Sequence, residues 1–134
     1  MTDVQWVFDR AIHLMDEQDE DTGKTETQDT REYKLRALSI LNVMRSELAP
    51  LSMRYGVSEN GTRPLPDMIL DFKDEIGLDD DICQGIMPYG LAALLLLGED
   101  STKASFFNQK YEELKARHSA KSSAVWEDIP YDFM

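Results

Sequence analysis

The stretch 78–100 constrains the fold of this chain more than any other segment. Its middle, residues 91–97, is a run of consecutive apolar residues with acidic residues on both sides. A helix that is apolar on every face is either buried or spans a membrane, and a span needs roughly 20 apolar residues. Asp81 and Glu99 leave too little room for a span. We therefore expect a helix buried in the core, with Leu94 buried like its neighbours.

This central segment contains a break followed by small residues. Pro88 removes a backbone donor and clashes with the carbonyl four residues earlier, which predicts a kink or two helices meeting there. Asp79 suits the start of the helix and Gly98 its end. The small residues after the proline allow another helix to approach closely, so we expect the tightest packing there. The core motif comprises Pro88, Tyr89, Gly90, Leu91, Ala92 and Ala93.

Apolar residues at helical spacing predict one helix near the start of the chain and another after the central segment. The first runs from residue 2 or 3 to Met15, and the last from Asp100 or Ser101 to about Lys115 or beyond. One face of the last helix should be apolar. That face carries Ala104, Phe107, Tyr111, Leu114 and His118, with Phe106 beside it.

The longest predicted helix lies between these two. Asp29 with Glu32 resembles a capping box at its start. Pro50 predicts a bend or restart near Ala49. Its charged side, which includes Arg45, is expected to face solvent. A long connection follows over residues 56–77, and we expect a short apolar segment in it to pack on the helices: Met68, Ile69, Leu70 and Phe72.

These elements predict an all-α fold, a small bundle of four to five helices around a buried, proline-kinked central helix. Residues 1–118 form the predicted single helical domain. Residues 119–134 are expected to be a linker of small residues followed by a tail that mixes aromatic and acidic residues.

The charge balance excludes some classes of partner. The chain has 134 residues, a net charge of −12 and a pI near 4.4. Binding to nucleic acid or to an anionic membrane needs clustered Lys and Arg, so neither is expected. Cys83 is the only cysteine, which excludes an internal disulfide. The N-terminus does not resemble a signal peptide, and we expect a cytoplasmic protein.

No pattern in the chain predicts catalysis, a cofactor or a metal. His13 has no second ligand at a metal-binding offset, so a structural or solvent-exposed role is expected. The acidic stretch 16–29 lacks the Gly and Glu that a calcium loop requires at its sixth and twelfth places. We therefore expect no catalytic residue, no cofactor and no metal site, and we interpret the chain as a non-enzyme.

Two groups of apolar residues are not needed by a four-helix core. Trp6 and Ile12 lie off the apolar stripe of the first helix, so they either widen its buried face or form a contact surface. The tail is too apolar for a solvated terminus, so it either folds back on its own core or docks on another chain. The interface candidates are Trp6, Ile12, Trp126, Ile129, Pro130, Tyr131 and Phe133.

The pattern that runs from PYGLAA (88–93) through LLLGED (95–100) to YEEL (111–114) resembles a family of small phage and prophage proteins. These proteins come from tailed phages of Gram-positive bacteria, and the likeness covers most of residues 1–118. The resemblance implies a virion structural role, at the neck where head joins tail, as in small helical head–tail connector proteins. The ending WEDIPYDFM departs from the family pattern.

The expected function is therefore that of a non-enzymatic phage structural or assembly protein at the head–tail junction, which acts through protein–protein packing. Its partners would be copies of itself, in a ring, or other virion proteins. It would be cytoplasmic during assembly, with the virion as a further location. The alternative is an acidic regulatory or nucleic-acid-mimic protein that binds a basic partner surface. Salt dependence separates the two, because a charge mimic loses affinity steeply with ionic strength.

Overall fold

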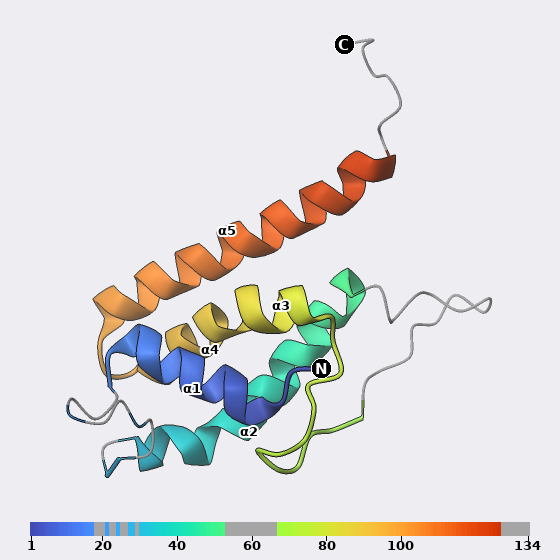
Figure 1. Ribbon diagram of the computed structural model, residues 1–134. Coiled ribbons are helices and arrows are strands. Elements are labelled where there is room, and N and C mark those ends of the chain that lie inside the picture. The colour runs from blue at the N-terminus through green and yellow to red at the C-terminus, as the bar shows by residue number, and fades with distance from the viewer. Residues whose placement is uncertain (18–20, 22–23, 25–26, 29, 53–66, 127–134) are drawn as a thin grey trace.

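The computed structural model describes residues 1–17, 21, 24, 27–28, 30–52 and 67–126, and side chains only as far as residue 119. Within this part of the chain there are five α-helices, one 3-10 helix and no β-strand. The predicted all-α bundle is confirmed, because the helices pack against one another (Figure 1). In chain order they are α1 (Val4–Met15), α2 (Arg31–Leu48), η1 (Ala49–Leu51), α3 (Asp80–Gly85), α4 (Met87–Leu96) and α5 (Ser101–Trp126).

The central segment is two helices rather than one kinked helix. α3 ends at Gly85 and α4 begins at Met87, with Ile86 at the junction. Pro88 lies in the first turn of α4, where its missing N–H would have no partner within the helix. The proline therefore begins the second helix instead of bending the first. In Figure 1, α3 and α4 follow one another beneath α5.

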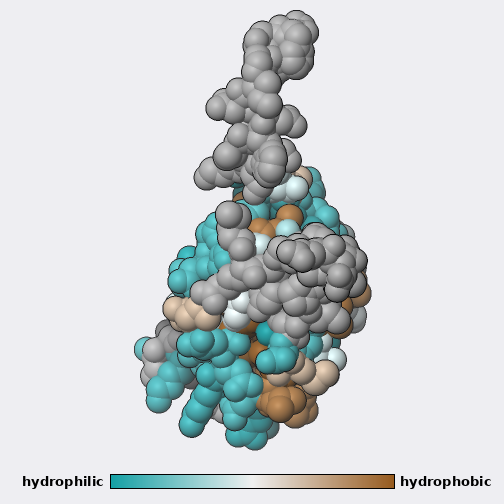
Figure 2. All heavy atoms as spheres, turned by 90° about the vertical axis from the view of Figure 1, so that its right-hand side faces the viewer, coloured by the Kyte–Doolittle hydropathy of each residue, from teal (hydrophilic) through white to brown (hydrophobic). Residues whose placement is uncertain are grey.

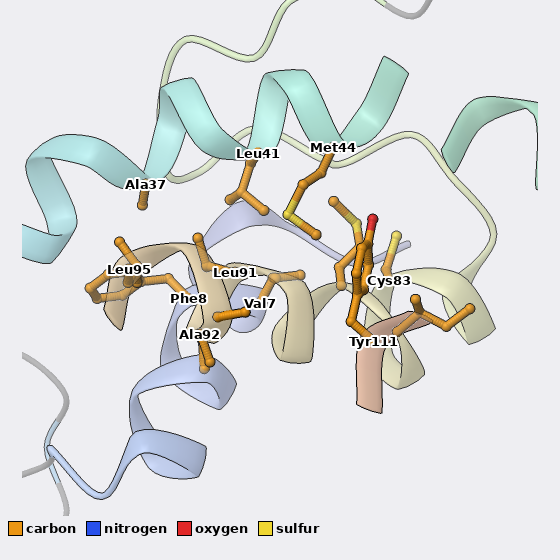
Figure 3. Close-up of a cluster of buried hydrophobic side chains, with 14 of the residues drawn as sticks. Val7, Phe8, Ala37, Leu41, Met44, Cys83, Leu91, Ala92, Leu95 and Tyr111 are labelled. Carbon is orange, nitrogen blue, oxygen red and sulfur yellow. The ribbon is translucent and has the colours of Figure 1, made fainter. Parts of the chain in front are cut away.

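The core is built around α4, which packs against α1, α2 and α5. Figure 3 shows side chains of α1 and α2 directed toward α4, among them Phe8 and Leu41, which meet its Leu91. These three residues are 1%, 0% and 0% exposed. Burial of such large side chains stabilises a fold by about 1.5 to 3 kcal/mol each.

The prediction that α4 is buried on every side is wrong at its C-terminal end. Leu94 is 42% exposed and Leu97 is 63% exposed, whereas Leu95 is 1% exposed. Leu94 lies one turn after Gly90 on the same side of the helix. That side is covered by α2 and α5 side chains at Gly90 but is open one turn later.

The start of α1 is tied to the loop that precedes α3. Asp3 is the N-cap and accepts a hydrogen bond from the backbone N–H of Trp6. The N–H groups of Val4 and Gln5 donate to loop carbonyls at residues 74 and 72, each over 2.9 Å. The first N–H groups of a helix have no intrahelical partner, so these loop carbonyls satisfy them.

The first turn of α2 differs from the prediction. The helix begins at Arg31 with Thr30 as the N-cap residue, and Asp29, the predicted cap, lies outside the described residues. The restart near Pro50 is confirmed, because η1 begins at Ala49 directly after α2 ends.

Arg45 is buried, which corrects the prediction of a solvent-facing side chain. It is 5% exposed, and its Nε donates to the carbonyl of Ile76 over 2.8 Å. Its Nη1 donates to the carbonyl of Asp67 and to the side chain of Asn42. The loop over residues 67–77 covers this side of α2, and the arginine holds both ends of the loop.

The expected apolar segment in this loop contacts the helices through fewer residues than predicted. Ile69 is buried, and its backbone N–H and carbonyl both bond to the side chain of Asn42. Phe72 packs edge to face on Phe8 with ring centroids 5.4 Å apart. Met68 and Leu70 are 69% and 75% exposed, because alternate residues of an extended segment point in opposite directions.

α5 is longer than predicted and continues through the expected linker. Residues 119–123 are helical, and the helix ends at Trp126. The predicted apolar face packs on the bundle as far as His118, whose Nε2 lies 3.3 Å from the carbonyl of Leu51. Asp100 caps the helix by accepting from the N–H of Lys103. Beyond His118 the helix projects past the other helices (Figure 1).

Candidate functional site

Two adjoining hollows form a groove between α1, α4 and α5. Their volumes are about 500 and 340 Å³, and both are lined by Leu14, Tyr89 and Lys110. We refer to them together as the α1–α5 groove. Its remaining lining residues are Arg10 from α1, Gln84, Gly85 and Pro88 from α3 and α4, and Phe106, Phe107, Gln109, Glu113 and Leu114 from α5.

Aromatic rings form one wall of the groove. The Tyr89 and Phe107 ring centroids are 6.4 Å apart, and Phe106 packs edge to face on Phe107 at 5.5 Å. Phe107 is 7% exposed, whereas Phe106 is 63% exposed. A large aromatic side chain that is ordered against other rings and still faces solvent offers contact area at low entropic cost.

The charged residues at the groove leave an excess of positive charge. Arg10 and Lys110 form no ion pair with any residue that the structure describes. The single acidic lining residue, Glu113, already pairs with Arg117 over 3.0 Å. In a chain with a net charge of −12, this is a locally basic site.

Trp6 lies on the same side of α1 as the groove wall. It is 39% exposed, and it precedes Arg10 and Leu14 at spacings of four and eight residues, which share one helix face. Ile12 is 0% exposed and belongs to the core. The prediction of Ile12 as an interface residue is therefore wrong, because this side chain widens the buried face of α1.

Most of the candidate interface residues in the tail lie outside the described residues. Trp126 is the last residue of α5. Ile129, Pro130, Tyr131 and Phe133 lie outside the described residues. Among the motif residues, Tyr89 is half-buried and lines the groove together with the buried Pro88, while the other four are buried in the interior.

A separate hollow of about 470 Å³ contains polar residues that satisfy one another. The Tyr33 hydroxyl donates to Glu99 over 2.5 Å, and Arg36 donates to the carbonyl of Leu95 over 3.2 Å. Burial, and then the hydrogen bond to Glu99, raise the pKa of the Tyr33 hydroxyl far above its usual value. A phenol held protonated in this way is a hydrogen-bond donor rather than a nucleophile at neutral pH.

The remaining reactive side chains are placed as structural groups. Burial raises the pKa of the Cys83 thiol to about 12, so it stays protonated and packs as a small apolar residue. His13 is exposed, as predicted.

Within the described ranges, no group of three or more His, Cys, Asp or Glu is placed to hold a metal ion. None of the helices in those ranges is long and apolar enough to cross a membrane.

Comparison with protein-family models, with curated proteins and with solved structures finds no match to this chain. The α1–α5 groove is therefore defined by its own geometry: an aromatic wall, a half-exposed tryptophan on the adjoining helix face, and two cationic side chains that have no acidic partner in the part of the chain that the structure describes.

Proposed function

We propose that this chain is a non-enzymatic structural and assembly protein of a tailed phage that acts through protein–protein packing at the head–tail junction. The observation that carries this proposal is the α1–α5 groove, with Phe106 held against Phe107 and exposed. An apolar surface of this kind, beside a core that is already complete, is typical of a contact site. The motif resemblance to phage proteins supplies the biological setting.

The position of α5 supports assembly through two different surfaces. The groove lies along the first half of α5, and the aromatic tail begins at its far end, after Trp126. With a rise of about 1.5 Å per residue, Lys110 and Trp126 are about 24 Å apart along the helix. Two separated patches on one subunit are what a head-to-tail interface uses, and such interfaces close into rings when the rotation allows.

The acidic composition favours a second candidate, a regulatory protein that binds a basic surface. The observation is the net charge of −12. An interface of that kind is driven by charge, so its affinity falls steeply between low and high ionic strength. Packing through aromatic side chains persists in high salt, because burial of apolar surface is not screened.

The test is incorporation into particles, measured with a groove variant. Phe106→Ser should leave the fold intact, since the ring is 63% exposed, and should reduce the amount of the protein in purified particles of the phage that encodes it. Leu35→Ser is the matched control, because Leu35 is 84% exposed on α2 and does not line the groove. Absence of the wild-type protein from particles would contradict the proposal, as would equal incorporation of both variants.

A further inference from the structure

We propose that the α1–α5 groove binds the C-terminal segment, residues 126–134, of a second copy of the same chain. This inference rests on the proposed function and names the occupant of its contact site. The segment reads WEDIPYDFM, which combines large apolar residues with three acidic residues and contains no basic residue. The groove has the complementary composition, with an aromatic wall and cationic side chains.

The acidic segment and the groove carry opposite charges. Arg10 and Lys110 have no acidic partner among the described residues, and Glu113 is occupied by Arg117. An acidic segment would supply the missing partners to both cations. Complementary charges of this kind favour one partner and one register over others.

The apolar part of the segment also fits the groove. Ile129, Tyr131 and Phe133 alternate along the chain, so an extended segment would present all three on one side. The wall formed by Tyr89, Phe106 and Phe107 offers rings for edge-to-face contact with such side chains. In the same extended segment Asp128 and Asp132 would lie on the opposite side, toward the rim.

The geometry of α5 favours a second copy over the chain's own tail. The helix carries Trp126 about 24 Å beyond Lys110, and α5 projects away from the bundle there (Figure 1). The groove residue of α5 nearest to Trp126 is Leu114, about 18 Å away along the helix. In the chain's own tail Ile129 lies at most about 11 Å from Trp126, which leaves this residue short of the groove. The tail of a neighbouring copy has no such limit.

Charge reversal in the full chain tests this inference. Lys110→Glu should weaken self-association, measured by sedimentation velocity over a concentration series, by about tenfold or more. Lys103→Glu is the matched control: it makes the same charge change on the exposed side of α5, outside the groove lining, and should have little effect. Asp128→Lys in the tail should weaken association as Lys110→Glu does.

Mixing the two variants provides the decisive measurement. Each carries one intact partner surface, so an equimolar mixture of Lys110→Glu and Asp128→Lys should associate more tightly than either variant alone. Circular dichroism of each variant checks that the helices are unchanged. Restoration on mixing supports a contact between the groove of one copy and the tail of another.

Three results would overturn the inference. They are equal effects of Lys110→Glu and Lys103→Glu, no gain on mixing, and a wild-type chain that stays monomeric up to about 1 mM. None of them contradicts the proposed function by itself, because that function is tested separately by incorporation of the Phe106→Ser variant into particles. If the chain self-associates and Lys110→Glu has no effect, the copies pack through another surface. If Phe106→Ser is incorporated normally, the proposed function fails as well.

Discussion

Gly90 of α4 lies against the ring of Tyr111 in α5. A Cβ atom added to Gly90 would stand 2.7 Å from Tyr111 Cε1 and 2.6 Å from Met44 Cε, closer than side chains approach in folded proteins. The Tyr111 hydroxyl is held by a hydrogen bond to Glu47, so the ring has little freedom to move aside. α4 therefore packs closely on α2 and α5 just after Pro88, where the motif has small residues.

Gly90→Ala should lower the free energy of unfolding by about 1 to 3 kcal/mol, because the added methyl group overpacks the contact between α4 and α5. This loss should exceed the gain of about 1 kcal/mol that alanine brings to a helix. Gly98→Ala is the control, since no atom lies within 4 Å of its added Cβ. Urea denaturation of both variants checks the prediction, and an equal change in both would contradict it.

A carboxylate introduced in the middle of α4 should destabilise the fold strongly on the buried side of the helix and weakly on its exposed side. Leu91→Asp should abolish cooperative folding, because Leu91 is 0% exposed and an unpaired buried carboxylate costs several kcal/mol. Leu94→Asp should fold with a loss of about 1 kcal/mol or less, because Leu94 is 42% exposed. Thermal melts followed by circular dichroism measure both. Loss of the fold in Leu94→Asp would mean that this side of α4 is covered.

Helices α1, α2 and α5 were predictable because each carries an apolar stripe at helical spacing. Val7 and Phe8 in α1, and Tyr111 in α5, fall on stripes that the sequence shows directly, and all three are buried. The buried state of Arg45 was not predictable in this way. Its place opposite the stripe of α2 is typical of solvent exposure, and only the path of the loop over residues 67–77 buries it.

The α1–α5 groove, too, was only partly predictable from the sequence. Phe106 was recognisable as an apolar residue beside the packed face of α5, and Trp6 as one off the stripe of α1. Arg10 and Lys110 gave no signal, because they are a hundred positions apart and meet the same groove only through the packing of α1 and α5 on α4. Residues 119–123 have mostly the small side chains that are typical of linkers, but they contain no Gly or Pro that would end a helix, and α5 continues through them.

The free energy of unfolding should fall in alkaline solution because the thiol of Cys83 is buried. The pKa of Cys83 rises from its ordinary value of 9.0 to about 12, so below pH 9 the thiol is protonated in both the folded and the unfolded chain. Above pH 9 the unfolded chain releases a proton that the folded chain keeps, and stability falls until the pH passes about 12. The contribution from Cys83 should be about 1.4 kcal/mol smaller at pH 10 than at pH 8.

Cys83→Ala should remove this share of the pH dependence. Tyr33 and Tyr111 also have raised pKa values, and their shares begin near pH 10 and remain in the variant. Urea denaturation of both chains at pH 8 and pH 10 gives the comparison. The free energy of unfolding should decline less in Cys83→Ala, and identical declines would show that the thiol ionises equally in both states.

Arg45 should be among the most costly polar residues to replace. Arg45→Met keeps much of the side-chain volume but leaves the carbonyls of Asp67 and Ile76 without this donor. We expect the free energy of unfolding to fall by about 2 to 4 kcal/mol. Arg36→Met is the matched control, because Arg36 is exposed and donates to one carbonyl, that of Leu95, so its loss should be below about 1 kcal/mol.

Hydrogen exchange would separate loss of the loop from loss of the whole fold. The amides of Ile69 and Ile76 bond to Asn42 and to the carbonyl of Thr2, so they report on whether the loop stays attached to α2 and to the segment before α1. In Arg45→Met they should exchange faster than amides in the middle of α4, because Arg45 holds the two ends of the loop. Equal acceleration at all of these amides would instead mean that the loop and the bundle open together.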